Sequence, residues 1–260
     1  MPTFVAYHRL PSGGDANEAP GRSYQVSFKY FTYATCSLPL LAFCFCIGYS
    51  IIYNFERSTA TSCRARNVLP SISAAIGGFS PQREVWQVAI SLDFVPRMVL
   101  IYVYQHYNYS KAGNKLVYIR SILMLIENFA LIILTYYDST HDYTIHRNAF
   151  VTFIISSLLH MFLLFCSQRR NDRFEIKLKN HLAMVNFIGI FLAMFFFIVH
   201  GIHCPDYIYS LFALCEYIVV LTNIAYHGSI IYDFPNKYLT LSPGDCIRLG
   251  DQKRYITMQP

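Results

Sequence analysis

Six long runs of apolar residues divide the chain, and each is long enough to cross a bilayer as a helix. About 20 residues suffice for a crossing, because a helix rises ~1.5 Å per residue. The pattern predicts an all-α polytopic membrane protein, a bundle of six transmembrane helices with no separate extramembrane domain. The predicted spans are residues 31–53, 85–105, 116–137, 148–167, 182–199 and 207–232.

The composition agrees with this fold class. Hydrophobic residues make up 54% of the 260 residues and charged residues only 14%, whereas a soluble domain carries about 25% charged residues. The mean hydropathy is +0.33. The net charge is +6, but the basic residues lie in short segments between the apolar runs and form no basic face. We therefore expect no nucleic-acid partner.

Lysine and arginine in the connections indicate the orientation, because positively charged loops stay on the cytoplasmic side. The most basic connection, residues 168–181, would be cytoplasmic, and this orientation places both termini in the cytoplasm. The chain then divides into an N-terminal tail (1–29), a six-helix domain (30–232) and a C-terminal tail (233–260). The basic residues of the 168–181 connection are Arg169, Arg170, Arg173, Lys177 and Lys179.

The first connection, residues 54–84, would be luminal and is the longest of the loops. Leu69, Ile72 and Ile76 recur there at helical spacing before a Gly-Gly stop signal. This segment either lies on the membrane as a short amphipathic helix or packs as a cap over the bundle. In the first case its arginines could hold phosphate groups. The sequence leaves both interpretations open.

Two cysteines fall on the predicted luminal side, which is the oxidising side. Cys63 lies in the first connection and Cys204 in the short connection at 201–206, and together they suggest one disulfide. No cysteine or histidine spacing matches a zinc site. We therefore expect no metal and no cofactor.

Polar side chains interrupt the apolar spans. In the last span Glu216, Asn223 and His227 are seven and four residues apart, so they share one stripe of a 3.6-residue helix. A carboxylate that faces lipid is costly, so this stripe must face protein or a wet cavity. The other spans contribute possible partners, namely Asp93, Arg97, Arg120, Glu127, Asn128, Ser156, Ser157 and His160.

The helical rise predicts that several of these side chains lie in one layer. Glu127 and Glu216 come out about 12 to 15 Å from the luminal ends of their spans, and Arg97 and His160 about 18 Å. Arg97 and Arg120 are the expected cationic partners of the carboxylates. A carboxylate beside a histidine suits general-base chemistry. The alternative is a structural network that fixes the helix register.

A second candidate site lies at the predicted luminal rim. Asp142 and His146 come just before the fourth span, and His200 and His203 follow the fifth, so these side chains could meet at the level of the lipid headgroups. The serines at 156–157 are not expected to be nucleophiles, because the sequence has no G-x-S-x-G elbow. The rim and the deeper layer remain alternatives.

Several segments resemble the post-GPI-attachment-to-proteins factor two family. They occur in order over nearly all of the chain after residue 55, and the N-terminal tail and the end beyond Tyr238 are not covered. The matching segments are TATSC, NVLPSISAAIGG and PQREVW within 59–86, Pro96-Arg97, IENFALIILTY at 126–136, YTIHRNAF at 143–150, SSLLHM at 156–161, LCEYIVVLTNIAYH at 214–227 and DFPNK at 233–237.

This resemblance implies a multi-pass protein of the Golgi or endoplasmic-reticulum membrane that acts in fatty-acid remodelling of GPI anchors. In that process lyso-GPI, still attached to its protein, regains a saturated chain at its sn-2 hydroxyl. The implied partners are GPI-anchored proteins and lyso-GPI, with membrane lipids as possible acyl donors.

Two functions fit the resemblance. In a membrane acyltransferase, Glu127, His160 or Glu216 would deprotonate the sn-2 hydroxyl, and Arg97 or Asn223 would stabilise the oxyanion. The alternative is a non-catalytic, lipid-binding scaffold that presents lyso-GPI to a separate acyltransferase. The expected substrate-binding residues are Arg97, Asn128, Asn223, His227 and His146.

Overall fold

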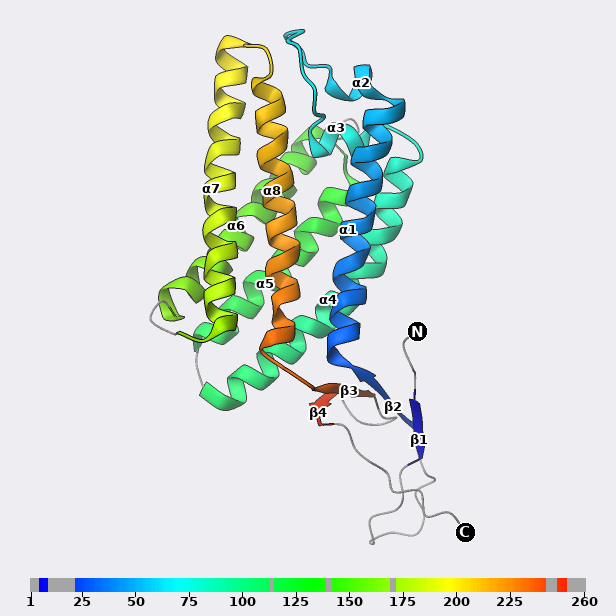
Figure 1. The fold of residues 1–260 in the computed structure, drawn as a ribbon, viewed down its shortest axis with the longest axis vertical. Helices are drawn as coiled ribbons and strands as arrows, with labels where there is room; N and C mark the ends of the chain where they lie inside the picture. The colour runs from blue at the N-terminus through cyan, green and yellow to red at the C-terminus, as the bar shows by residue number, and fades with distance from the viewer. Residues whose placement is uncertain are drawn as a thin grey trace, which may run out of the picture. The chain divides into compact units, whose positions relative to one another are not determined.

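The structure is a computed structural model and consists mainly of long helices (Figure 1). It describes residues 5–8, 22–112, 115–138, 142–168, 172–241 and 247–251. Within these residues six helices are long and apolar enough to cross a membrane, which confirms the predicted number of spans. They are α1 (Phe28–Tyr53), α4 (Gln82–Ala112), α5 (Lys115–Tyr136), α6 (Tyr143–Gln168), α7 (Phe174–His203) and α8 (Ile208–Gly228).

The helices extend beyond the predicted spans where polar residues continue the helical pattern. Helix α7 begins at Phe174 rather than at residue 182, and α4 begins at Gln82. Pro39 lies inside α1 and Pro96 inside α4. Because proline has no backbone N–H, each helix lacks one of its backbone hydrogen bonds there. Neighbouring helices in a bundle can satisfy the carbonyls that such a proline leaves unpaired.

The chain divides into two compact units, and the smaller one joins the two ends of the chain, residues 1–34 and 230–260. Four antiparallel strands pair there in the order β1-β2-β3-β4. The sequence predicted an N-terminal tail over 1–29 and a C-terminal tail over 233–260 but did not predict this sheet. Parts of both tails lie outside the described residues. The strands are β1 (Val5–His8), β2 (Arg22–Ser27), β3 (Tyr238–Leu241) and β4 (Arg248–Gly250).

The larger unit, residues 35–229, holds the helical bundle. Helices α7 and α8 run side by side (Figure 1), and a small residue allows their close approach. A Cβ added to Gly189 would come within 3.0 Å of the Val219 side chain. Asn186 then donates hydrogen bonds to the Val219 carbonyl at 2.9 Å and to Thr222 Oγ1 at 2.8 Å. Small residues and interhelical hydrogen bonds are the usual means of helix association in membranes.

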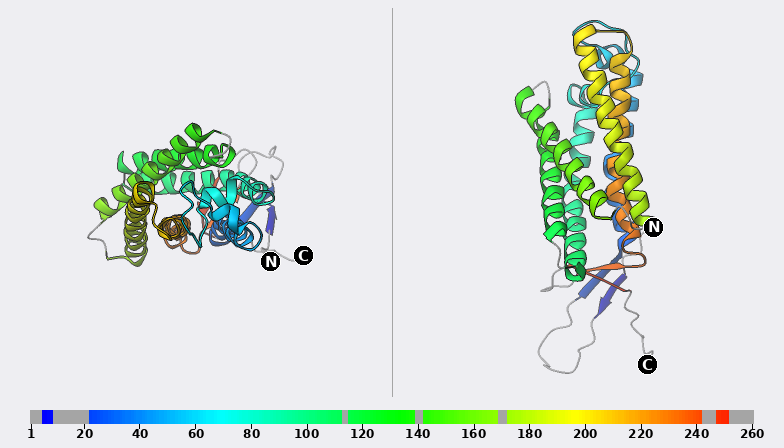
Figure 2. Two further views of the ribbon diagram at one scale, coloured as in Figure 1. Left: turned by 90° about the horizontal axis from the view of Figure 1, so that it is seen from above. Right: turned by 90° about the vertical axis from the view of Figure 1, so that its left-hand side faces the viewer.

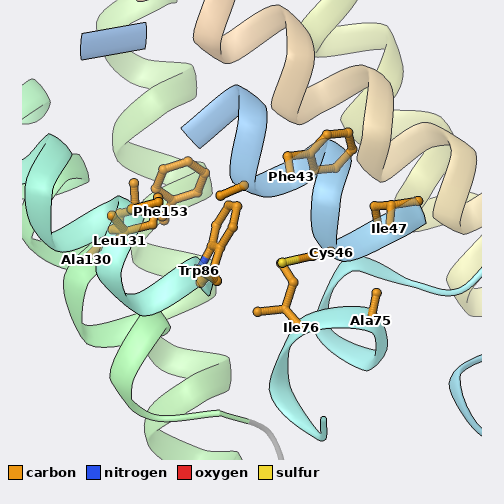
Figure 3. Packing of buried hydrophobic residues seen from close by; sticks show 12 residues of the cluster. Phe43, Cys46, Ile47, Ala75, Ile76, Trp86, Ala130, Leu131 and Phe153 are labelled. Atoms are coloured by element: carbon orange, nitrogen blue, oxygen red, sulfur yellow. The ribbon is translucent and has the colours of Figure 1, made fainter. Parts of the chain in front are cut away.

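The first connection packs onto the bundle through two short helices, α2 (Phe55–Thr59) and α3 (Ile72–Gly77). Ala75 and Ile76 of α3 belong to a buried cluster with Cys46 of α1 (Figure 3). Trp86 lies in the same cluster, and its Nε1 donates to Thr135 Oγ1 at 3.2 Å. Of the two interpretations of this loop, the structure therefore supports the packed cap.

Candidate functional site

Four helices place polar side chains around Glu127 of α5, which is fully buried. Arg97 comes from α4, His160 from α6, and Asn223 and His227 from α8. Each helix turns an otherwise apolar surface outward, so that its few ionisable residues meet inside the bundle. We call this group, with Glu127 at its centre, the Glu127 cluster.

The carboxylate of Glu127 contacts every other member of the cluster. Its Oε1 lies 3.3 Å from Arg97 Nη2, 2.9 Å from Asn223 Nδ2 and 3.1 Å from His227 Nε2. Its Oε2 lies 2.7 Å from His160 Nε2. An ionised carboxylate has about four lone-pair sites, and Glu127 accepts four contacts, three on Oε1 and one on Oε2.

The contacts fix the tautomers of both histidines. An ionised Glu127 can only accept hydrogen bonds, so His160 and His227 must each carry a proton on Nε2 and a lone pair on Nδ1. His160 Nδ1 is buried without a hydrogen-bond partner among the described residues. The His227 side chain is 8% exposed whereas that of His160 is 0% exposed. His227 therefore offers the more accessible basic nitrogen of the cluster.

Further polar groups surround the cluster. Arg97 Nη1 lies 4.0 Å from Asp93 Oδ2, one helical turn away on α4. Arg97 Nη2 also reaches Asn223 Oδ1 at 3.4 Å, and Asn223 Nδ2 donates to Ser157 Oγ at 2.8 Å. Removing one partner of such a buried ion pair typically costs about 3–5 kcal/mol, so the cluster is expected to hold the four helices in register.

Two predicted members of the polar layer have other roles. Arg120 donates from Nε to the His160 carbonyl at 3.2 Å and from Nη1 to the Tyr104 hydroxyl. No carboxylate contact of Arg120 is found among the described residues, so its expected pairing with a carboxylate is wrong. Asn128 donates to the Phe94 carbonyl at 3.2 Å, close to Pro96 where the ladder of α4 lacks an N–H, and is not part of the cluster.

Glu216 lies apart from the cluster. Its Oε2 accepts a hydrogen bond from the backbone N–H of Ile72 at 3.1 Å, at the start of α3. Asn223, which does contact Glu127, lies two helical turns further along α8, about 10 Å by helical rise. The predicted common layer of Glu127 and Glu216 is therefore not what the structure shows. The spans do not begin at one level, because the α7–α8 turn reaches beyond the α5–α6 turn (Figure 2).

The residues around Glu216 hold the first connection against α8. Ser210 Oγ accepts from Val68 N at 2.8 Å, and the Tyr217 hydroxyl donates to the Pro70 carbonyl at 2.5 Å. A disulfide joins Cys63 to Cys204, as predicted, with the Cα atoms 6.0 Å apart. We call this end of the bundle the disulfide end.

The candidate rim residues do not form one group. Asp142 Oδ1 accepts from Thr144 N and Ile145 N at 3.0 Å and so caps α6. His200 Nε2 lies 3.3 Å from Cys63 Sγ, and the side chain of His203 is exposed. His146 instead lies 3.2 Å from Ser73 Oγ. The sequence did not single out Ser73, because only the fold brings α3 to the start of α6.

Glu127, His160 and His227 could also converge on a metal ion, since their ligand atoms lie within 4.8 Å of one another. A carboxylate with two histidines is a known donor set for zinc and iron. However, Arg97 places a guanidinium on Glu127 Oε1, and a second cation there would be repelled. A ligating histidine also usually donates its other N–H to an acceptor, and His160 Nδ1 has none among the described residues. The geometry favours a hydrogen-bonded acid–base network.

A six-helix membrane bundle with a buried, charged centre defines the class of this protein. The model of the family described as Frag1/DRAM/Sfk1/Cwh43P N-terminal domain matches residues 27–237, and the chain belongs to this family. The resemblance found in the sequence is confirmed by several relatives named for post-GPI attachment to proteins factor 2. No solved structure matches the chain.

Three relatives illustrate the similarity. "Acyltransferase PGAP2" of Xenopus tropicalis is 38% identical over 237 residues, which cover 85% of this chain and 94% of the relative. "Post-GPI attachment to proteins factor 2" of Drosophila melanogaster is 36% identical over 222 residues, covering 81% and 87%. The protein of the same name in Caenorhabditis elegans is 32% identical over 234 residues, covering 84% and 89%.

Proposed function

We propose that this protein acts in GPI-anchor remodelling and restores a saturated acyl chain to lyso-GPI at its sn-2 hydroxyl. The names of its relatives, two of which are called acyltransferases, support the pathway and the reaction type. The observation that carries the proposal is the Glu127 cluster, in which one carboxylate lies 2.7 Å from His160 and 3.1 Å from His227. A hydroxyl nucleophile needs a base of this kind.

In a direct transfer, His227 would be the group that takes the proton. Glu127 holds Nε2 of His227, so Nδ1 is the basic atom and the carboxylate stabilises the imidazolium that forms. Arg97 and Asn223 are engaged by Glu127, so we give them a positioning role in place of the predicted oxyanion role. Asn128 and His146 lie outside the cluster and do not take part in this route.

We further propose that the disulfide end faces the lumen of the Golgi or of the endoplasmic reticulum, with both termini in the cytoplasm. A disulfide between Cys63 and Cys204 persists in an oxidising compartment. The most basic connection, residues 168–181, lies at the opposite ends of the spans, as positive-inside retention requires. The first connection also carries four arginines, but it is the longest loop, where the charge rule is weaker. GPI-anchored proteins are then accessible on the same side, and lipids of that leaflet are the acyl donors.

A second candidate function is the presentation of lyso-GPI to a separate acyltransferase. It is favoured by one observation, the full burial of Glu127 together with the four contacts that its carboxylate accepts. A carboxylate that accepts four hydrogen bonds is well suited to hold helices together, and a structural network of this kind needs no substrate.

Purified protein in phosphatidylcholine vesicles tests the proposal. The vesicles would carry a ¹³C-labelled stearoyl chain and lyso-GPI, and mass spectrometry would follow labelled diacyl-GPI. We expect transfer by the wild type and by Ser156→Ala, whose hydroxyl bonds only to carbonyls of its own helix. In the direct route His227→Gln lowers the rate about 10²- to 10⁴-fold. Lyso-GPI binding without any transfer by the wild type would support presentation.

A further inference from the structure

Ser73 and His146 form a hydroxyl–imidazole pair that lies outside the Glu127 cluster. Ser73 is in the first turn of α3 and His146 is in the first turn of α6. Ser73 Oγ lies 3.2 Å from His146 Nε2, and His146 Nδ1 lies 2.8 Å from the Tyr137 carbonyl oxygen. One hydroxyl, one imidazole and one backbone acceptor are thus aligned at the disulfide end.

The partners decide which nitrogen of His146 carries the proton. A carbonyl oxygen can only accept a hydrogen bond, so the proton of the neutral imidazole is on Nδ1. The lone pair on Nε2 then faces Ser73, and the serine hydroxyl donates to it. This is the arrangement of a serine nucleophile and its general base, with the Tyr137 carbonyl as the group that orients the base.

The surroundings hold this geometry in place. Ser71 Oγ accepts from Ala74 N and caps α3, and Glu216 accepts the Ile72 N–H. Gly77 lets the α5–α6 turn approach α3, because a Cβ at this position would lie 3.1 Å from Asp138 Cβ. The Glu216 contact thus joins α3 to α8, and the close approach at Gly77 sets α3 against the turn that supplies the Tyr137 carbonyl.

The pair is also within reach of a substrate. Ser73 and His146 are both half-buried, whereas Glu127 and His160 are fully buried. The N–H of Ser73 itself makes no hydrogen bond within the described part of the chain, which leaves one donor for a developing oxyanion. This N–H is one of those that every helix leaves unpaired in its first turn, so the pair is distinguished by its geometry and its accessibility.

We propose that Ser73 is an acyl-accepting nucleophile that His146 activates, and that it carries the chain from a glycerophospholipid to lyso-GPI. The inference rests on the proposed function and names the nucleophile for a two-step route. In the first step Ser73 Oγ attacks the ester carbonyl while His146 Nε2 takes the hydroxyl proton. The bond to the glycerol oxygen breaks, that oxygen takes the proton from His146, and acyl-Ser73 and a lysophospholipid result.

The second step reverses the roles. The sn-2 hydroxyl of lyso-GPI gives its proton to His146 Nε2 and attacks the acyl-Ser73 carbonyl. The bond to Ser73 Oγ breaks, and Oγ takes the proton back. Nothing is oxidised or reduced, and the enzyme returns to its starting state.

This route does not use the Glu127 cluster as its base. His146 and His160 are fourteen residues apart on α6, which is about 21 Å along the helix, so one hydroxyl cannot contact both. In the two-step route the cluster holds α4, α5, α6 and α8 in register, and the chemistry takes place at the disulfide end.

The test is a search for the covalent intermediate. Full-length protein in vesicles of phosphatidylcholine with a ¹³C-labelled stearoyl chain is quenched in acid without lyso-GPI, and its peptides are mapped by mass spectrometry. We expect the labelled acyl group on Ser73, and its disappearance when lyso-GPI is added. His146→Gln should lower the loading rate about 10²- to 10⁴-fold.

Variants separate a chemical role from a structural one. Ser73→Ala should show no loading, and Ser73→Cys should load as a thioester that neutral hydroxylamine removes. Ser62→Ala, an exposed serine of the same connection, is the matched control and should load like the wild type. A purely structural serine would leave no acyl group on either the wild type or Ser73→Cys.

The outcomes distinguish this inference from the proposed function. Transfer to lyso-GPI with no label on Ser73 and an unchanged rate in Ser73→Ala overturns the inference and leaves the function standing. Loading of Ser73 without transfer to lyso-GPI supports the nucleophile and overturns the function. Neither loading nor transfer by the wild type overturns both.

Discussion

The Glu127 cluster and the Ser73–His146 pair both set an imidazole against an oxygen, but the hydrogen bonds run in opposite directions. In the cluster the histidines donate to a carboxylate. In the pair the histidine accepts from a hydroxyl, because its other nitrogen is held by the Tyr137 carbonyl. The first arrangement stabilises a buried negative charge, whereas the second prepares an oxygen nucleophile.

Burial separates the two regions as well. A charge inside a bundle must be compensated at every acceptor site, and Glu127 has four donors and no exposure. The pair is neutral and half-buried, so it needs no such compensation. In the proposed two-step route the charged cluster is therefore structural and the neutral pair is reactive, whereas in the direct route the cluster itself supplies the base.

The largest effect is expected when Glu127 is removed. Glu127→Ala leaves Arg97 and two imidazole N–H groups buried without their acceptor, and such a loss costs about 3–5 kcal/mol. The melting temperature of the detergent-solubilised protein should fall sharply and its yield should drop. Glu84→Ala, which removes an exposed carboxylate of α4, is the control and should leave the melting temperature unchanged. An equally stable Glu127→Ala would refute the structural part of the comparison.

Loss of the disulfide should have the next largest effect, and this effect should be confined to the disulfide end of the bundle. The bond between Cys63 and Cys204 joins residues 141 positions apart, and native disulfides typically contribute about 2–4 kcal/mol. The double change to serine should speed tryptic cleavage after the exposed Arg64 and Arg66, and slow acyl transfer if the pair is the reactive site. Cys166→Ser, at an exposed free cysteine, should do neither. Equal protection from trypsin would contradict the role assigned to this bond.

A smaller effect is expected at Glu216. Glu216→Gln keeps an acceptor for the Ile72 N–H, so stability should change by less than about 1 kcal/mol, and Glu216→Ala, which leaves that N–H unpaired, should cost about 1–3 kcal/mol. Transfer activity should follow stability in both variants. Loss of transfer in a stable Glu216→Gln would instead restore the acid–base role that the sequence suggested for this carboxylate.

The hydrophobic pattern was sufficient to predict the six helices and the cysteine pair. It also predicted Asn223 and His227 on one stripe, because helical spacing is a local property. The predicted depth of Glu216 was wrong. It was counted from the end of its own span, and the ends of the spans lie at different heights. The relative heights of helices come from their packing, which spacing within one helix does not contain.

The pair at the disulfide end could not be predicted either. Ser73 lies in a six-residue helix without a nucleophile motif, and His146 looked like one of several loop histidines. Their contact depends on Gly77, where a missing side chain allows the α5–α6 turn to approach α3. Likewise, the sheet of the terminal unit pairs strands from opposite ends of the chain, and neither strand is stable alone.

The last prediction concerns glycosylation, where we expect no change in the wild type. Glycosylation reports on which side of the membrane the Ser73–His146 pair lies. Asn108, in the sequence Asn-Tyr-Ser, is the only N-glycosylation acceptor in the chain, and the proposed orientation puts it in the cytoplasm, where no glycan is added. Glycosidase should therefore leave the mass of the wild type unchanged. Ala60→Asn creates an acceptor with Thr61 and Ser62 in the exposed part of the first connection and should gain a glycan. A glycosidase shift in the wild type that Asn108→Gln removes would reverse the orientation and place Ser73 and His146 away from the lipid they are proposed to acylate.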